Sequence, residues 1–326
     1  MHNKHSKRLQ QWQRHIVVCL CLVVAALAAT GCSDKGEPVR LQRFEQLIFD
    51  GKGNAADFTG TTLLNYNPDD PRFMAMLDDF RNDPTVRRIY EVTDSLYRDL
   101  AWLEQQLGDA MQRAHTLWPE LDYSHFYTLV TADYNNYANR VFCDLTDIAI
   151  SLDCYTLGHV AEMQRFGVPN YIARLCRREY IVADVMAAAT RSHIEMPEGD
   201  MTFLDFAIAE GKTLYLLEQV LPKTADTILL RYSAEQLAWM EANVERVWGW
   251  LIEHDVLYSS DQARLRNLVD DAPKTNAFGE GSAPRTSAYI GWQIVRRYKK
   301  RTSPTLAELM AERDSRKILT LSGWRP

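Results

Sequence analysis

Apolar residues at helical spacing run through most of this chain. Between 85 and 117 they recur at steps of three and four residues, with charged residues between them and prolines just outside the stretch. Thr202 is a candidate cap for a later helix, and Ser233 with Gln236 has the spacing of a capping box. The pattern predicts helices over residues 71–81, 85–117, 169–192 with a break near 177, 203–221, 234–254, 287–300 and 305–313.

The segment from 124 to 157 has a different pattern. Short runs of aromatic and β-branched residues at 126–130, 140–143 and 148–152 predict the strands of a small sheet. No other part of the chain shows this character clearly, so the expected fold is α+β and mainly α-helical. Neither an internal repeat nor a low-complexity linker divides residues 40–326, which predicts a single domain.

The first 31 residues have the composition of a bacterial lipoprotein signal peptide. Four cations and no acid precede an apolar run over 16–29, which is shorter than the roughly 20 residues of a membrane span. Small residues then lead to Gly31 and Cys32, a junction that an uncleaved anchor would leave unexplained. We therefore expect cleavage before Cys32, diacylglycerol on its thiol, and a lipidated tether over 32–39.

This anchor determines the expected localisation. It places the mature protein on the cell membrane or the outer membrane, facing the periplasm or the cell surface, with the N-terminal lipid as its only expected non-protein group. The whole chain has a formal charge of −6, and the signal segment removes four cations, so the mature chain carries −10. A chain this acidic is not expected to bind nucleic acid.

Three cysteines stay in the mature chain beyond the lipidated one: Cys143, Cys154 and Cys176. Three thiols cannot all pair, and an exported compartment would permit one disulfide, between Cys143 and Cys154. The apolar residues around them favour buried free thiols instead.

The mature chain has no motif for catalysis or metal binding that we can assemble. It lacks H-E-x-x-H, G-x-S-x-G, a Walker A loop, G-x-G-x-x-G and any cysteine pair with zinc-ligand spacing. We therefore predict no catalytic residue, no metal site and no enzymatic activity.

Glu210 is the most unusual ionisable residue. On a helical projection it shares an apolar face with Phe203, Ala207 and Leu214, where an ionised carboxylate must be paired, hydrogen-bonded, protonated or ligating. We favour a structural pair inside the domain, between the helix that carries Asp184 and the C-terminal helix. The expected partners are Arg178, Tyr180 or Tyr289.

Asp184 is more ambiguous. Arg177 and Arg191 lie seven residues to either side of it, so the three would form one charged stripe on a helix. We interpret this stripe as a solvated face.

Several blocks of the chain resemble the gliding-motility lipoprotein B (GldB) family over most of the mature sequence. The most specific are Glu210-Gly211-Lys212 with Leu214, Tyr215 and Leu217, and the run from Tyr289 through Gly291-Trp292-Gln293 to Tyr298. The others are 43–45, 148–158 and 178–185. The resemblance implies a membrane lipoprotein linked to the gliding and type IX secretion apparatus, with no established catalytic activity.

The order of segments is also similar to that of zincin-like metallopeptidases. In that likeness Asp184 lies where the H-E-x-x-H helix would carry its motif, and Glu210 takes the place of the third ligand, while both histidines are missing. This implies a catalytically dead, zincin-like domain. Its vestigial cleft would be lined by Glu210, Asp184, Arg178, Tyr180 and Tyr289.

The leading hypothesis is a lipid-anchored scaffold or accessory subunit that binds an envelope protein complex. The runner-up is a hydrolase of peptides or envelope polymers, such as an envelope metallopeptidase, for which we find no recognisable set of acid, base, nucleophile or metal ligands. A third class, a receptor that holds a peptide or glycan in the vestigial cleft without cutting it, fits the residues as well as the scaffold does.

Overall fold

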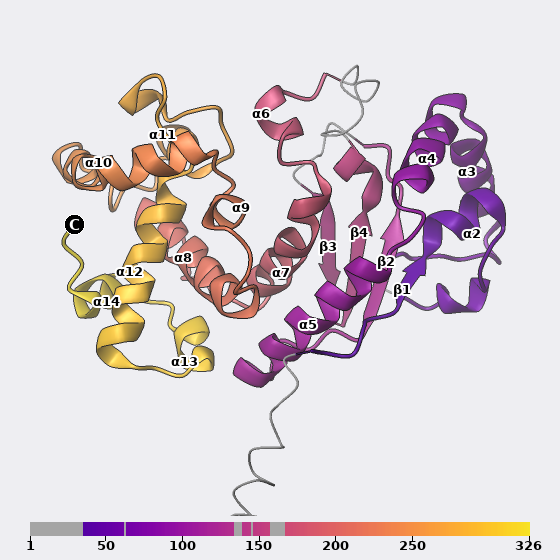
Figure 1. Ribbon diagram of the computed structural model, residues 1–326, viewed down its shortest axis with the longest axis horizontal. Coiled ribbons are helices and arrows are strands. Elements are labelled where there is room, and N and C mark those ends of the chain that lie inside the picture. Colours follow the sequence, from indigo (N-terminus) through magenta and orange to yellow (C-terminus); the bar gives the residue numbers. More distant parts are fainter. Residues whose placement is uncertain (1–34, 62, 134–138, 145, 157–166) are drawn as a thin grey trace, which may run out of the picture.

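The computed structural model describes residues 35–326 except 62, 134–138, 145 and 157–166. The predicted signal peptide, Cys32 and the first residues of the tether lie outside this part of the chain. Helices dominate the described residues, and a four-stranded sheet lies between two groups of them (Figure 1). The prediction of a mainly helical α+β fold is confirmed.

The sheet has the strand order β1-β2-β4-β3. Strands β1 (Leu41–Arg43), β2 (His125–Leu129) and β4 (Asp147–Ser151) are parallel, and β3 (Val141–Asp144) pairs antiparallel with β4. The sequence pattern predicted the last three strands and missed β1. A strand of three residues is too short to show a periodicity, and β1 exists because it pairs with β2, far away in the sequence.

The two faces of the sheet are both buried. Phe126 and Ile148 face a large apolar cluster that continues to the C-terminal helices, and Tyr127 and Ala149 face a smaller one. Helices α2 (Phe44–Asp50), α3 (Pro71–Asn82) and α4 (Pro84–Leu96) form the smaller cluster with the sheet. Helices α5 (Ala101–Leu117) and α7 (Ile181–Arg191) pack on the other face.

The single helix predicted over 85–117 is wrong, because the chain forms α4 and α5 with a break between them. The Tyr97 hydroxyl donates to the Tyr155 carbonyl oxygen (3.0 Å), which fixes the end of α4 in the core. The Asp99 carboxylate then accepts a hydrogen bond from the Ala101 N–H (2.9 Å) at the start of α5. The apolar spacing continues across this break, so the pattern did not reveal it.

The helices predicted in the C-terminal half form, but those over Asp226–Leu230, Gln262–Val269 and Ser315–Ser322 were not predicted. The first part of the predicted 169–192 helix is only four residues long. The predicted capping box forms at Ser233 with Gln236, and the predicted cap Thr202 forms a second box with Asp205. The expected break near 177 separates α6 from α7. The remaining helices are α6 (Asn170–Ala173), α8 (Phe203–Val220), α9 (Asp226–Leu230), α10 (Ala234–Glu253), α11 (Gln262–Val269), α12 (Thr286–Thr302), α13 (Leu306–Ala311) and α14 (Ser315–Ser322).

Helices α8 and α12 cross with their backbones in contact. A Cβ atom built on Gly211 would lie 2.3 Å from the carbonyl carbon of Gly291, and one on Gly291 would overlap the carbonyl oxygen of Ala207. Only glycine permits this approach. The crossing holds the C-terminal helices against the centre of the molecule.

All three cysteines of the described residues are free, with Cys154 and Cys176 buried and Cys143 half-buried. The preference for free thiols over a Cys143–Cys154 disulfide is confirmed. Within the part of the chain that the structure describes, no helix combines the length and the apolar character needed to span a bilayer.

Candidate functional site

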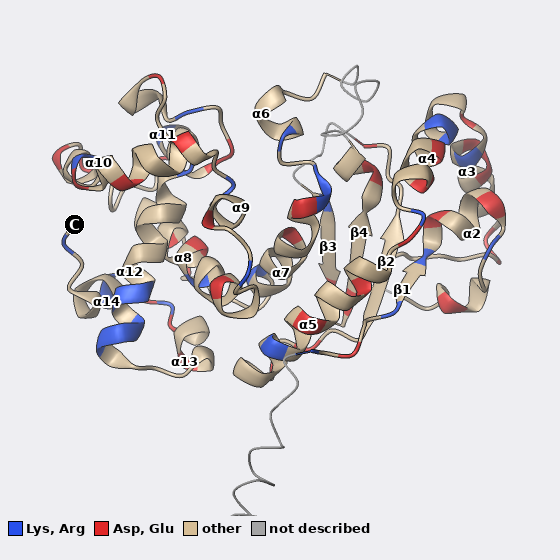
Figure 2. Cartoon of the chain, in the orientation of Figure 1, with Lys and Arg blue, Asp and Glu red and all other residues tan. Residues whose placement is uncertain are grey.

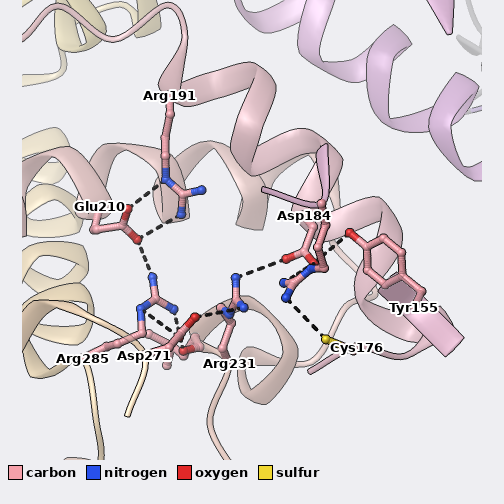
Figure 3. Close-up of polar contacts among 10 residues, drawn as sticks. Tyr155, Cys176, Asp184, Arg191, Glu210, Arg231, Asp271 and Arg285 are labelled. Atoms are coloured by element: carbon pink, nitrogen blue, oxygen red, sulfur yellow. Dashed lines mark hydrogen bonds and ion pairs between the residues drawn. The ribbon is translucent and has the colours of Figure 1, made fainter. Parts of the chain in front are cut away.

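Seven charged side chains meet between α7, α8 and the segments that follow α9 and α11 (Figure 3). We call this group the arginine-carboxylate network. It consists of Arg140, Asp184, Arg191, Glu210, Arg231, Asp271 and Arg285.

Asp184 forms the buried end of the network. Its Oδ2 atom accepts hydrogen bonds from Arg140 Nη2 (2.7 Å) and from the Tyr155 hydroxyl (3.0 Å), and Arg231 Nη1 lies 3.5 Å from Oδ1. Burial disfavours the charge, but Arg140 and Arg231 outweigh it and hold the pKa of Asp184 below its ordinary value. Arg140 also donates to the Sγ atom of Cys176 at 3.6 Å, and burial raises the pKa of that thiol.

Arg231 and Arg285 form the middle of the network, with Asp271 between them. Asp271 Oδ2 lies 3.1 Å from Arg231 Nη2, and Oδ1 lies 3.6 Å from Arg285 Nε. Both arginines have a left-handed backbone, with φ of 64° and 46°. Such a backbone costs a non-glycine residue of order 1 kcal/mol, so the surrounding contacts must stabilise it. The Nε atom of Arg231 is buried without a hydrogen-bond partner among the described residues.

Glu210 forms the end of the network that reaches solvent. Its carboxylate accepts hydrogen bonds from Arg191 Nε (2.9 Å) and Nη2 (3.2 Å) and from Arg285 Nη2 (2.6 Å). Burial disfavours the charge, but Arg191 and Arg285 lower the pKa of Glu210 to about 2. The Arg191 side chain is 43% exposed, whereas that of Arg285 is 8% exposed.

The network contains four guanidinium groups and three carboxylates, so it carries an excess of one positive charge. Every carboxylate is held ionised by at least two arginines, which leaves none with the raised pKa that a general acid requires. In the described part of the chain, no group of three or more His, Cys, Asp or Glu side chains is placed to hold a metal ion. The arrangement can bind anions or stabilise the fold.

The structure brings together two of the five residues expected to line the cleft. Asp184 and Glu210 belong to one network, with Glu210 between the helix of Asp184 and the N-terminus of α12, as expected. The predicted partners of Glu210 are wrong. Arg178 instead stacks on Trp102, with its guanidinium carbon 4.0 Å from the ring centroid. Tyr180 is buried in the turn before α7, and Tyr289 packs against the large apolar cluster.

The solvated stripe predicted through Asp184 is also wrong. The Asp184 side chain is only 11% exposed, because its face of α7 is turned toward Arg140, next to β3, and Arg231, after α9. Arg191 lies on the same face but pairs with Glu210. The arginines at 140, 231 and 285 gave no signal in the sequence, because each reaches the network from a connecting segment.

The sequence profile of the family described as gliding motility protein GldB matches residues 32–326. The chain belongs to this family. The resemblance seen in the sequence blocks is confirmed over the whole of the predicted mature chain. Among curated proteins and among solved structures, none matches the chain significantly, and the likeness to zincin-like metallopeptidases gains no support.

The two most specific blocks of the GldB resemblance meet at the crossing of α8 and α12. Glu210 enters the network, Gly211 contacts the α12 backbone at Gly291, and Lys212 points to the end of α13. The buried Lys212 ammonium group donates to the carbonyl oxygens of Met310 (3.3 Å) and Glu312 (2.6 Å). Burial lowers the pKa of Lys212 to about 8. Three consecutive residues therefore join α8 to three different parts of this GldB-family protein.

Proposed function

We propose that the protein is a lipid-anchored, non-catalytic subunit of an envelope assembly of the gliding-motility or type IX secretion type. Membership of the GldB family supports the motility context. The predicted lipid on Cys32 would hold the domain at the membrane, and two or more acyl chains give stable anchoring where one is marginal. A zincin-like ancestry that has lost its ligands would explain why charged residues gather between α7 and α8.

The non-catalytic part of this proposal rests on one observation: every carboxylate of the network is already paired with arginines. Asp184, Glu210 and Asp271 each lie within ion-pair distance of two arginines, and these pairs lower their pKa values. A metal ion would have to displace guanidinium groups from these carboxylates, and a general base would have to leave its ion pairs. The network acts as a brace that fixes α7, α8 and the start of α12 relative to one another.

A specific observation favours the receptor as a second candidate. The network has one more guanidinium than carboxylates, and Arg191 at its rim is partly exposed. Arginine binds carboxylate groups through two parallel hydrogen bonds, so an acidic peptide or glycan could complete the charge balance. In this case the network would hold a ligand without cleaving it.

Isosteric substitutions in the native host test the main proposal. Asp184→Asn and Glu210→Gln remove charge from the two ends of the network and keep the shape of each side chain. A non-catalytic subunit predicts that both variants, where they accumulate to the wild-type level, support motility or secretion. Loss of function by a variant that melts like wild type, together with peptidase activity of the purified wild type, would contradict it.

The anchor is tested separately. Cys32→Ala should leave an unprocessed precursor that takes up no labelled palmitate, and recovery of normally processed protein would refute the lipid prediction. Arg191→Gln separates scaffold from receptor, because it removes a partly exposed guanidinium at small cost in stability. If this variant crosslinks to envelope partners as well as wild type does, the result supports the scaffold. If it selectively loses this crosslinking, the result supports the receptor.

A further inference from the structure

The C-terminal half of α12 is strongly basic in a chain that is acidic overall. Five of the six residues from 296 to 301 are arginine or lysine, whereas the formal charge of the chain is −6. Figure 2 shows this basic half of α12 on the lower left of the molecule. The first described segment of the chain, which follows the grey trace, also lies on the lower side of this view, below α5 (Figure 1).

This half of the helix borders a hollow of about 700 Å³. Four cationic side chains, one amide and one indole line it, and no carboxylate does. We call it the basic hollow. Its lining residues are Gln293, Arg296, Arg297, Lys300, Arg301 and Trp324.

The charge in the basic hollow is mostly uncompensated. Arg296 pairs with Glu218, with Nη2 2.5 Å from Oε2. Among the ion pairs of the described residues, none joins a carboxylate to Arg297, Lys300 or Arg301. The indole N–H of Trp324 is shielded from solvent and has no acceptor in the described part of the chain. The hollow therefore presents three positive charges that no carboxylate of the described residues pairs, which suit an anion with several oxygens.

Contacts with α14 account for only part of this arrangement. The Nε atom of Arg297 donates to the Ser322 carbonyl oxygen (3.2 Å), and the Arg301 guanidinium fills the space beside Gly323 where a Cβ would lie. Both cations thus lie at the C-terminus of α14, where the helix dipole is negative. A helix terminus carries about half an elementary charge, so most of the positive charge is left over, together with that of Lys300.

We propose that the basic hollow binds the phosphate of an anionic phospholipid headgroup, so that the protein contacts its membrane both through this site and through the lipid on Cys32. The inference rests on the proposed function for the presence of a membrane beside the domain. Arginine, lysine and tryptophan are the side chains that favour the headgroup layer of a bilayer. The commitment to a lipid, and not to a soluble phosphate, comes from the length of the tether.

That tether is short. The Gly36 N–H donates to Asp109 Oδ1 (2.9 Å), and a Cβ on Gly36 would lie 2.2 Å from the Gly108 carbonyl oxygen, so the chain is fixed on α5 from this residue onward. Four residues span at most roughly 14 Å when fully extended. A lipid on Cys32 would therefore hold this side of the domain close to the headgroups.

Vesicle binding tests the proposal without the anchor. The probe is the mature chain, residues 32–326, with Cys32→Ala, so that no acyl chain contributes. It is mixed with vesicles of phosphatidylcholine alone, or of phosphatidylcholine with phosphatidylglycerol, and the bound fraction is measured by sedimentation. We expect binding to the phosphatidylglycerol vesicles, reduced by excess glycerol phosphate more than by sodium chloride of equal ionic strength.

Variants then locate the site. Each cation near an anionic surface strengthens binding by roughly fivefold, so Arg297→Gln/Lys300→Gln/Arg301→Gln should lower the partition coefficient about 100-fold. Lys300→Gln alone, at an exposed position with no hydrogen bond or ion pair recorded in the described structure, should lower it about fivefold without affecting folding. The matched control, Arg72→Gln/Arg246→Gln/Arg266→Gln, removes three exposed cations from α3, α10 and α11. It should bind nearly as well as the parent chain.

Equal binding to both vesicle types, or equal losses in the triple variant and its control, would overturn the inference. Binding of glycerol phosphate without binding of vesicles would also overturn it, because the site would then take a soluble phosphate. These outcomes are independent of the anchor. Palmitate labelling of the wild-type protein reports on Cys32 alone, so either contact can fail while the other stands.

Discussion

Replacing Glu210 by alanine removes the carboxylate that two guanidinium groups of the network share. Arg191 is partly exposed and can turn to water, so its loss costs little. Arg285 is buried and keeps Asp271, whose Oδ1 atom is 3.6 Å from Nε, and the Leu230 carbonyl oxygen, which accepts from Nη1 at 3.3 Å. The variant therefore leaves a buried cation whose one remaining carboxylate among the described residues, Asp271, lies at a long distance.

The size of the effect follows from this imbalance. Removing one partner of a buried ion pair costs about 3–5 kcal/mol, and the remaining contact with Asp271 places Glu210→Ala near the lower end, at about 3 kcal/mol. At about 2 °C per kcal/mol for a large domain, the melting temperature should fall by about 6 °C. Glu210→Gln keeps an acceptor oxygen and the volume but raises the charge excess, so we expect about half that loss.

Acid conditions give a second measure of the same residue. Because the pKa of Glu210 is about 2 in the folded chain and ordinarily 4.5, its ionised form stabilises the fold fully above pH 4.5. This contribution is lost as the pH falls from about 4.5 to about 2. Wild type should therefore lose stability relative to Glu210→Gln across this range.

Thermal and chemical unfolding of the purified mature chain measure these differences. Glu245→Ala on α10 is the matched control, because Glu245 is exposed on its helix, and it should melt like wild type. A wild-type melting temperature for Glu210→Ala would refute the assignment of Glu210 as the carboxylate that compensates buried Arg285. Parallel acid profiles for wild type and Glu210→Gln would refute its low pKa.

Two further substitutions test the crossing of α8 and α12 and its buried lysine. Gly211→Ala should destabilise the fold by roughly 3 kcal/mol in urea unfolding, because its Cβ would lie 2.3 Å from the Gly291 backbone. The control Gly249→Ala, on an open face of α10, should stabilise the fold by about 1 kcal/mol. Equal effects would contradict the close crossing. Lys212→Met tests the burial of the ammonium group. Between the folded pKa of about 8 and the ordinary pKa of 10.5, folded wild type has lost a proton that the unfolded chain still binds. The free energy of unfolding of wild type should therefore rise by up to roughly 3 kcal/mol relative to the variant as the pH increases through this range. Parallel pH profiles would show that Lys212 titrates normally.

Local signals in the sequence predicted local structure well. The cap at Thr202 and the capping box at Ser233 depend on residues at most three positions apart, so both helices begin where the pattern placed them. The burial of Glu210 in a pair was also predictable, because an apolar face surrounds it on its own helix. Its partners were not, since Arg191 and Arg285 come from other elements.

The same reason explains the error at Asp184. The spacing of Arg177, Asp184 and Arg191 correctly places the last two on one face of α7, but spacing does not say what lies opposite that face. The answer depends on how the chain after α9 returns toward α7, with Arg231 in a left-handed conformation. Sequence periodicity contains no information on that return.

The crossing at Gly211 has a consequence for how this protein tolerates changes in length. Successive residues of a helix point about 100° apart. From one turn of α8, Glu210 therefore contacts the network, Gly211 the α12 backbone and Lys212 the end of α13. A substitution removes one of these contacts, whereas inserting or deleting a single residue between Thr202 and Glu210 rotates all three away together. The distance along the chain from the start of α8 to this turn is thus as constrained as the identity of the residues within it.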